Sequence, residues 1–450
     1  MKLRFWHRAL LLPLCAIAST LAAQEPLTLR QAIDRALGSN PQTAIARANE
    51  QDAVAAARLA RAQLIPQLGF TEDISRGDDP IYAFGSRLRQ RQFTQADFAL
   101  NTLNRPQPLG NFSTRFSGQW QAFDSFRTQK QIRQADLFRQ SAGSAGRAAD
   151  QQIVLRVTAA YQQLLYAQRQ VEVAHGEQKT AEVLEAQVAD HVKAGLAVQS
   201  DLMAAQVNSA ARKQKSIATE GAIELAWEEL RAAMGAPDFA ATPLKPIERH
   251  AFPEGSLQDE LATAARMRPD LMAAKQAQQA QVQAVGASKA GFGPRIGAYG
   301  NWEEDRGSLT TAGGNNWIAG VQISVDILPL ARRSQMARET AAQQRVDAQV
   351  AQARQQIRLQ VSQAHIQRRT SALQLETARA ATAQAAESLR IVQNRYNAGL
   401  ATITDLLRAE DAGRQAQANY WGAVYGNAMA YAQLLFAQGT LTPDAAEELQ

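Results

Sequence analysis

The stretch EVAH places Glu172 and His175 at the spacing that carboxylate-bridged di-metal sites use on a helix. Such a site needs a second copy of the motif and further glutamates on facing helices, and the sequence has no second copy. We therefore interpret His175 as a surface residue. The motifs HExxH, GxxxxGK and GxSxG are also missing from the sequence. We expect no catalytic residues, no metal site and no cofactor, and thus a protein that is not an enzyme.

Two stretches, AGLAVQSDL at 194–202 and AGLATITDL at 398–406, are nearly alike and lie 204 residues apart. Each contains a Gly-Leu pair followed by an aspartate, Asp201 or Asp405. The same offset aligns LRVTAAY (155–161) with LQVSQAH (359–365) and LRAAMG (230–235) with LLFAQG (434–439). Earlier in each half the offset is 228, so the first half carries 24 additional residues. The chain is therefore an internal duplication, and we expect most of the insertion in a long exposed loop within 71–111.

Each half is predicted to form a helix, two strands and two further helices joined by a turn. The first repeat (24–240) has helices at 28–65, about 128–193 and about 199–235, and strands at about 67–75 and 112–123. A linker at 241–256 leads to the second repeat (257–450), with helices at 257–290, about 331–397 and about 403–438, and strands at about 295–304 and 316–327. Residues 331–398 contain no Gly or Pro, and one helix of that length would extend ~100 Å. Coiled-coil or solenoid packing is therefore expected.

The predicted strands alternate between apolar and polar residues. In WIAGVQISVDI (317–327), Trp317 and Val321 belong to one face, whereas Gln322 and Ser324 belong to the other. The segment FSTRFSGQWQAF (112–123) alternates in the same way. Four strands cannot close a barrel, and open strand edges are not tolerated in hydrocarbon. Two copies would supply eight strands and three would supply twelve, so the predicted fold class is mainly α with a membrane β-barrel contribution.

The first 23 residues have the three parts of a secretory signal peptide: a basic start, an apolar run and small residues at STLAA. Cys15, the only cysteine, lies inside this segment, so no disulfide is expected in the mature chain. Of the formal charge of +6, three charges belong to Lys2, Arg4 and Arg8, which leaves +3. That value gives no reason to expect nucleic acid as a partner. No later segment has 18 consecutive apolar residues, so a membrane role would depend on the strands.

From LTLRQAIDRALGSNP onward, nearly the whole mature chain resembles the TolC-type outer membrane efflux proteins of Gram-negative bacteria. The resemblance rests on the duplicated unit, on RALGSNP, and on RYNAGLATITDLLRAE at 395–410. It implies a homotrimer with a 12-stranded β-barrel in outer membrane lipid that continues into a 12-helix α-barrel in the periplasm. It also implies a passive exit duct for efflux or type I secretion, docked to a periplasmic adaptor (membrane fusion) protein and an inner-membrane RND or ABC pump. The resemblance does not identify the cargo, which could be drugs, metal ions or a secreted polypeptide.

The resemblance also implies roles for the residues around the two turns. The turn residues would be the adaptor-docking tips: Gly195, Leu196, Gly399 and Leu400. The pore constriction would be formed by Asp201, Asp405 and Tyr396. Ala401 and Arg408 depart from residues that some members use at the tip, so the closing contacts cannot be copied from the family.

Two alternatives remain open from the residues themselves. The aspartates could serve only to start their helices, with Ser200 or Thr404 as the cap. Alternatively, symmetry-related copies would place them around an aqueous bore, where their charge would favour cations. At the level of the whole chain, the alternative is a periplasmic coiled-coil adaptor or scaffold without a membrane barrel. Such an adaptor would need a β-rich domain of its own, whereas this chain offers four strands in two distant places.

Overall fold

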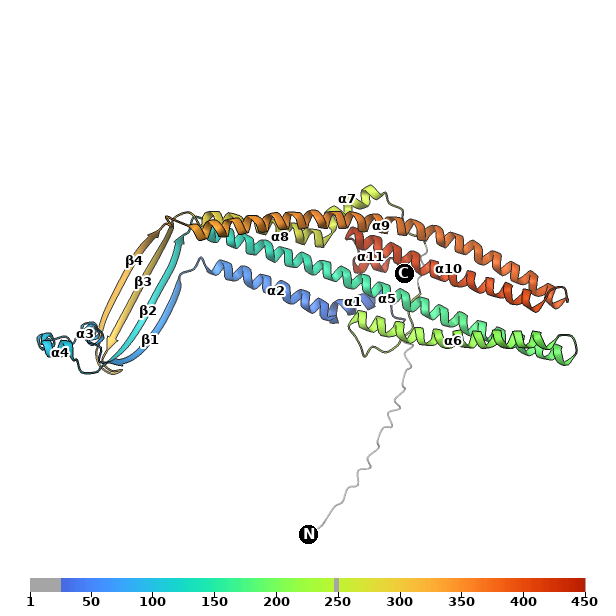
Figure 1. The fold of residues 1–450 in the computed structure, drawn as a ribbon, viewed down its shortest axis with the longest axis horizontal. Helices are drawn as coiled ribbons and strands as arrows, with labels where there is room; N and C mark the ends of the chain where they lie inside the picture. Colours follow the sequence, from blue (N-terminus) through green and yellow to red (C-terminus); the bar gives the residue numbers. More distant parts are fainter. Residues whose placement is uncertain (1–25, 247–250, 450) are drawn as a thin grey trace, which may run out of the picture.

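The computed structural model describes residues 26–246 and 251–449, so the predicted signal peptide at 1–23 lies outside the described residues. The molecule is elongated, with a β-sheet at one end and two helical turns at the other (Figure 1). The first half contains α1 (Leu29–Ser39), α2 (Pro41–Ala62), β1 (Gln67–Gly77), β2 (Leu109–Phe123), α5 (Arg127–Lys193) and α6 (Gln199–Met234). The second contains α7 (Leu257–Met267), α8 (Pro269–Ala290), β3 (Arg295–Arg306), β4 (Gly314–Ser324), α9 (Leu330–Asn397), α10 (Ile403–Gln438) and α11 (Pro443–Glu447). Among the helices described, none is both long and apolar enough to cross a membrane.

The helices expected over 28–65 and 257–290 are each broken in two, which corrects the prediction. The breaks fall at Asn40 and Arg268, each directly before a proline. A proline disfavours helical backbone in the preceding residue, and both residues are extended, with ψ of 130° and 117°. The proline itself fits the first position of the next helix, where no N–H is needed. Each half therefore begins with a short helix set at an angle to a longer one.

Both breaks pack against the glycine that ends the last long helix of the same half. Gly235 and Gly439 have φ of 65° and 76°, a left-handed conformation that suits glycine. A Cβ on Gly235 would lie 2.8 Å from Asn40 Cα, and one on Gly439 would lie 2.7 Å from Arg268 Cα. The side chains of Asn40 and Arg268 donate to carbonyls at the end of the adjoining helix. We call each of these contacts a joint, and the duplication supplies one per half.

The main hydrophobic core surrounds these joints at the middle of the long helices. Tyr161 and Leu164 of α5 are fully buried there together with Leu29 of α1 and Met234 of α6. The Tyr161 hydroxyl donates to the carbonyl of Leu27 over 2.7 Å, which ties the N-terminal segment to α5. The described structure therefore has its thickest packing at mid-length, whereas the sheet end is thin (Figure 1).

The four strands form one antiparallel sheet in the order β1-β2-β3-β4, and the β2-β3 pair joins the two halves. An aromatic row runs across the whole sheet through the paired residues Phe70, Phe116, Trp302 and Trp317. The rings of Phe70 and Phe116 are 5.2 Å apart, and those of Phe116 and Trp302 are 5.8 Å apart. Trp317 is 78% exposed, so this apolar face is uncovered in the single chain. β4 ends at Ser324, earlier than the predicted residue 327.

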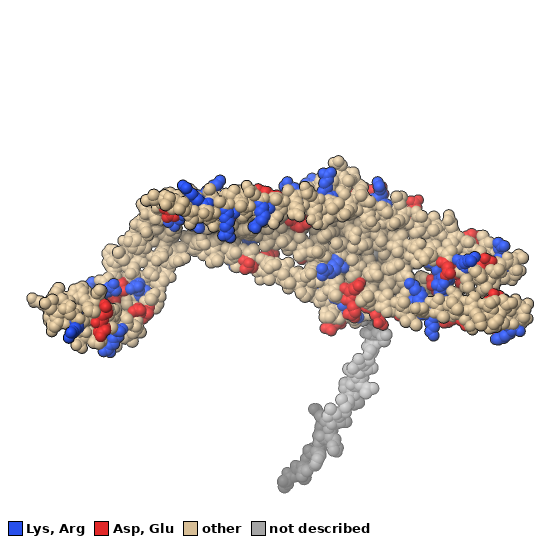
Figure 2. Space-filling model, in the orientation of Figure 1, with Lys and Arg blue, Asp and Glu red and all other residues tan. Residues whose placement is uncertain are grey.

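The opposite face of the sheet is polar, as the alternation predicted. The row next to the aromatic one pairs Arg115 with Glu303 and Glu303 with Asn316. The Arg115 guanidinium lies 2.6 Å from the Glu303 carboxylate. On the face in view, the middle of the sheet is free of charged residues, which gather at the end farthest from the helices (Figure 2). We call that end the outer end.

The segment between β1 and β2 is folded, which corrects the expectation of a long exposed loop over 71–111. The strands extend to Gly77 and from Leu109, and between them lie α3 (Pro80–Arg89), the 3-10 helix η1 (Gln95–Phe98) and α4 (Leu100–Asn104). Asp79 starts α3 by accepting a hydrogen bond of 2.9 Å from the Tyr82 N–H. The polar composition of the segment concealed this local order.

Substitution of the joint glycines should destabilise the protein strongly. Gly235→Ala or Gly439→Ala would place a Cβ against backbone and strain a left-handed residue, so we expect a loss of ~2 kcal/mol or more in the free energy of unfolding for each. Gly221→Ala is the matched control. It lies in the interior of α6 with open space around the new Cβ, and should be neutral or stabilising by up to ~1 kcal/mol. Chemical unfolding followed by circular dichroism measures the difference, and equal stability of Gly235→Ala and wild type would contradict the joint.

Candidate functional site

The two predicted turns lie together at the end of the molecule farthest from the sheet (Figure 1). Gly195 and Gly399 both have φ of 73°. In each turn the following leucine N–H donates over 2.8 Å to the carbonyl five residues earlier, and the glycine N–H donates to the carbonyl three residues earlier. This is the Schellman ending of a helix, which needs a left-handed residue at the glycine position. Leu196 and Leu400 are 76% and 69% exposed, so each turn presents one large apolar side chain.

The helices that follow the turns start differently. Thr402 caps α10, because its hydroxyl accepts from the Asp405 N–H and the Asp405 carboxylate accepts from the Thr402 N–H and hydroxyl. These hydrogen bonds lower the pKa of Asp405, with the Thr402 side chain as the largest cause. The cap of α6 is Val198, which has no side-chain oxygen. The caps are thus Thr402 and Val198, and the expectation of Ser200 or Thr404 in that position was wrong.

Tyr396 lies at the contact between the two helical hairpins. It packs against the tip core, a small cluster of apolar residues from α5, α6 and α10: Leu184, Val188, Ala205, Ile403 and Leu406. Burial raises the pKa of the Tyr396 hydroxyl, and the negative charge of Asp201 adds to the rise. The structure therefore brings Tyr396 close to Asp201, whereas Asp405 is engaged by its own helix start. Arg408 is one of the charges that act on Asp405.

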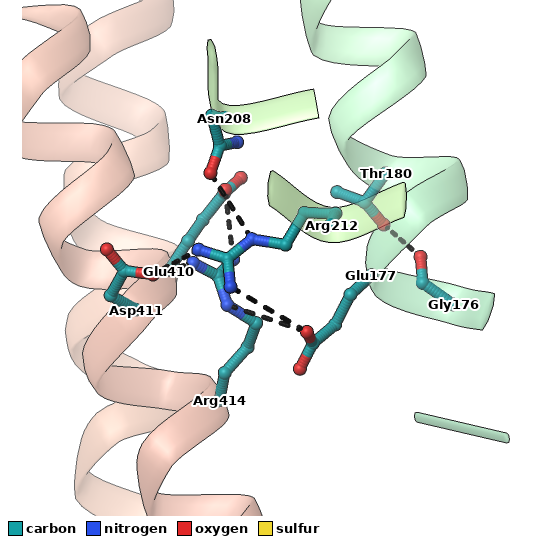
Figure 3. A network of polar contacts seen from close by, with 8 residues as sticks. All are labelled: Gly176, Glu177, Thr180, Asn208, Arg212, Glu410, Asp411 and Arg414. Carbon is teal, nitrogen blue, oxygen red and sulfur yellow. Dashed lines mark hydrogen bonds and ion pairs between the residues drawn. The ribbon is translucent and has the colours of Figure 1, made fainter. Parts of the chain in front are cut away.

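A network of charged side chains lies beside the tip core and joins α5, α6 and α10 (Figure 3). Glu177 of α5 faces two guanidinium groups, with its Oε2 atom 4.0 Å from Arg212 Nη1 and 3.9 Å from Arg414 Nε. Arg414 also contacts Glu410 over 3.4 Å, and both arginines bind Asp411. We call these five residues the tip network. It links the first hairpin to the second within one chain.

Four of the five side chains in the tip network are largely shielded from water, whereas Asp411 is 60% exposed. The Glu177 and Glu410 side chains are 16% and 10% exposed. Burial raises the pKa of both carboxyl groups, and Arg414 opposes the rise in each case. Sequence reasoning missed this network. The i,i+4 pair of Glu410 and Arg414 is visible in the sequence, but its partners on α5 and α6 become neighbours only through the packing of the hairpins.

The EVAH segment does not form a di-metal site in the described part of the chain. His175 pairs with Glu220 of α6 over 2.8 Å, and Glu172 pairs with Arg169, so EVAH forms two ordinary surface contacts. Within the described residues, no group of three or more His, Cys, Asp or Glu side chains could hold a metal ion. The site consists of two glycine turns with exposed leucines, a buried contact between hairpins and a set of acidic side chains near the turns.

Comparison with known proteins gives a family model and a set of similar folds. The model described as outer membrane efflux protein matches residues 32–236 and 261–440. The solved structure of CusC is 19% identical, with 91% of this chain and 92% of that chain covered and a TM-score of 0.78. VceC of Vibrio cholerae (20% identity, 91% and 96% covered) and the open state of MtrE of Neisseria gonorrhoeae (20%, 92% and 91%) both give a TM-score of 0.76. No curated protein sequence matches.

Loss of the central arginine should loosen the tip in a pH-dependent way. Arg414→Met leaves Glu177 and Glu410 buried without their shared cation. We expect the free energy of local unfolding at the tip to fall by ~1–2 kcal/mol, which corresponds to roughly ten-fold faster amide exchange in 403–420. The cost requires ionised carboxylates. It should be largest at pH 8 and shrink toward pH 5, because groups with a raised pKa take up protons there.

Arg390→Met is the control for this experiment, because Arg390 forms an exposed ion pair with Glu387 on the same helix, α9. It should leave exchange at the tip unchanged. Hydrogen exchange is measured by mass spectrometry and corrected for the intrinsic pH dependence of amides. This account of the tip network would be ruled out if Arg414→Met exchanged no faster than wild type at pH 8. It would also be ruled out if the difference in exchange rate from wild type grew toward pH 5.

Proposed function

This chain belongs to the outer membrane efflux protein family, a family of transport channels, and we propose that it is the outer membrane exit duct of a tripartite efflux or type I secretion system. In this proposal three copies form a 12-stranded barrel in the outer membrane and a 12-helix barrel in the periplasm. The duct is passive, so the energy comes from an inner-membrane RND or ABC pump that a periplasmic adaptor protein connects to it.

The observation that carries the proposal is the two-faced, uncharged middle of the sheet. From Ile296 to Trp302 in β3, and throughout β4, there is no Asp, Glu, Lys or Arg. At ~3.3 Å per residue, the 11 residues of β4 extend roughly 33 Å along the strand. With the strand tilt of ~40° found in outer membrane barrels, that length rises about 25 Å along the membrane normal, which matches the height of their apolar band. The apolar face carries the aromatic row and would face lipid. The polar face would line a water-filled lumen.

Closure of this sheet requires more than one chain. In the described chain, the outer edges of β1 and β4 have no neighbouring strand. Hydrocarbon does not tolerate unpaired edges, so β4 of one copy would pair with β1 of the next. Three copies give twelve strands, enough for a lumen, whereas eight-stranded barrels are filled by side chains.

The helical turns would form the periplasmic end of the duct. Their distance from the membrane would be about the length of α5. Leu196 and Leu400 are exposed and lie beside glycines that fix the turn, so they offer small, rigid apolar contacts for an adaptor. Asp201, Asp405 and Tyr396 would surround the bore at its narrowest point. A periplasmic coiled-coil scaffold, the alternative from the sequence, would leave the apolar face of the sheet without lipid to cover it.

The proposal is tested by localisation, assembly and conductance. The protein should fractionate with the outer membrane, migrate on a denaturing gel as a trimer when unheated and as a monomer when heated, and open stable channels in a planar bilayer. A heat-insensitive monomer found only in the soluble periplasmic fraction would refute the duct and favour the scaffold.

The acidic residues near the turns are expected to set ion preference. Asp201→Asn together with Asp405→Asn should lower the cation-to-anion permeability ratio by about two-fold or more, since three copies lose six like charges around one bore. Asparagine at 405 keeps an oxygen that can accept from Thr402, so the helix start should survive. Asp34→Asn, in α1 far from the turns, is the control. Reversal potentials in a KCl gradient measure the ratio, and an unchanged ratio in the double variant would reject the charge ring.

A further inference from the structure

The segment 78–108, which we call the outer lobe, is a small folded unit at the outer end of the sheet. Phe84, Phe93 and Phe98 pack edge to face, with ring centroids 4.7 Å (Phe84–Phe93) and 5.1 Å (Phe93–Phe98) apart. Arg87 of α3 pairs with Asp97 over 2.8 Å, and the Asp97 side chain is 7% exposed. The lobe therefore has its own core and its own ion pair, and it holds a defined position.

The lobe lies on the polar face of the sheet. Gln90 donates to the Asn111 side chain over 2.8 Å, and Arg89 lies 3.8 Å from the Glu303 carboxylate. The Tyr82 hydroxyl is 3.0 Å from the Ser75 hydroxyl. By strand alternation, Asn111, Glu303 and Ser75 all belong to the face opposite the aromatic row.

A glycine in β4 makes room for this contact. The Arg89 carbonyl oxygen lies only 1.9 Å from where a Cβ on Gly314 would be, so any side chain there would displace the end of α3. Gly314 is paired with Asp305, again a residue of the polar face. The absence of a side chain at this one position therefore allows α3 to pack closely on the sheet.

Three large apolar side chains of the lobe are exposed in the described chain. Ile81, Phe98 and Leu100 are 85%, 62% and 77% exposed. They cannot be covered by lipid if the polar face of the sheet lines the lumen, because the lobe is then inside the barrel mouth. In the trimer of the proposed function, on which this step rests, each copy directs its lobe toward the same axis.

We propose that the outer lobes of three copies contact one another through Ile81, Phe98 and Leu100, and that they form an apolar constriction at the outer mouth of the duct. The partner of each lobe is the same lobe of a second copy. The duct then has two narrow points, one at the helical turns and one at the outer end of the barrel. The second narrows the path for hydrated ions, which cross apolar constrictions poorly.

Conductance of the full-length protein in a planar bilayer with KCl tests the constriction. Ile81→Asp together with Leu100→Asp places six like charges where the lobes meet, and should raise single-channel conductance by roughly two-fold or more. Gly314→Leu should have a similar effect by lifting α3 from the sheet. Leu309→Asp, in the exposed turn between β3 and β4 at the same end, is the matched control and should conduct like wild type.

Cross-linking provides an independent measurement. The only native cysteine lies in the predicted signal peptide, so Ile81→Cys would be the only thiol of the mature chain. Mild oxidation should convert it to a covalent dimer on a non-reducing gel, whereas Leu309→Cys should stay monomeric. The contact between lobes is overturned if channels form but Ile81→Cys does not cross-link and conductance rises in neither the Ile81→Asp/Leu100→Asp double variant nor Gly314→Leu. A wild-type protein that forms no channel would instead refute the proposed function.

Discussion

The open edges of the four-stranded sheet are the constraint on which the rest of the molecule depends. β1 and β4 each carry a row of peptide groups that require partners, and the aromatic row beside them requires an apolar neighbour. Neither need can be met within the described chain. The ring of copies in the proposed function would meet both at once, because strand pairing would close the edges and lipid would cover the outer face. The long helices would then follow the same ring, since they continue directly from the strands.

The two joints fix how the short and long helices of each half meet. At mid-length, a helix break before a proline packs against a left-handed glycine at the end of another helix, and this happens in both halves. The contact is between backbones, so it fixes the distance and direction of the two helices with little freedom. The main core lies around the joints, which places the greatest stability where short and long helices meet.

Local rules made much of this fold predictable from the sequence, and long-range packing hid the remainder. The mainly helical class and the two faces of the strands follow from Gly and Pro positions and from alternation, whereas the family was recognised by the resemblance of the duplicated unit and of RYNAGLATITDLLRAE. The breaks at Asn40 and Arg268 were missed because both flanking segments are helical in pattern, and one proline changes only the residue before it. Arg414 and Glu177 could not be paired in advance, because they lie on different hairpins and meet only when the two hairpins pack together. The outer lobe was missed because its core of three phenylalanines is short and lies among polar residues.

The duplication also has a consequence for symmetry. The two turns share the same backbone conformation, but only the second is followed by a helix with a reciprocal side-chain cap. In a trimer, six turns of nearly equal shape would alternate around the rim, so the surface is close to six-fold in form while it is three-fold in chemistry. A partner that assembles as a ring of six identical subunits would therefore meet two kinds of binding site. Half of its subunits would bind differently from the other half.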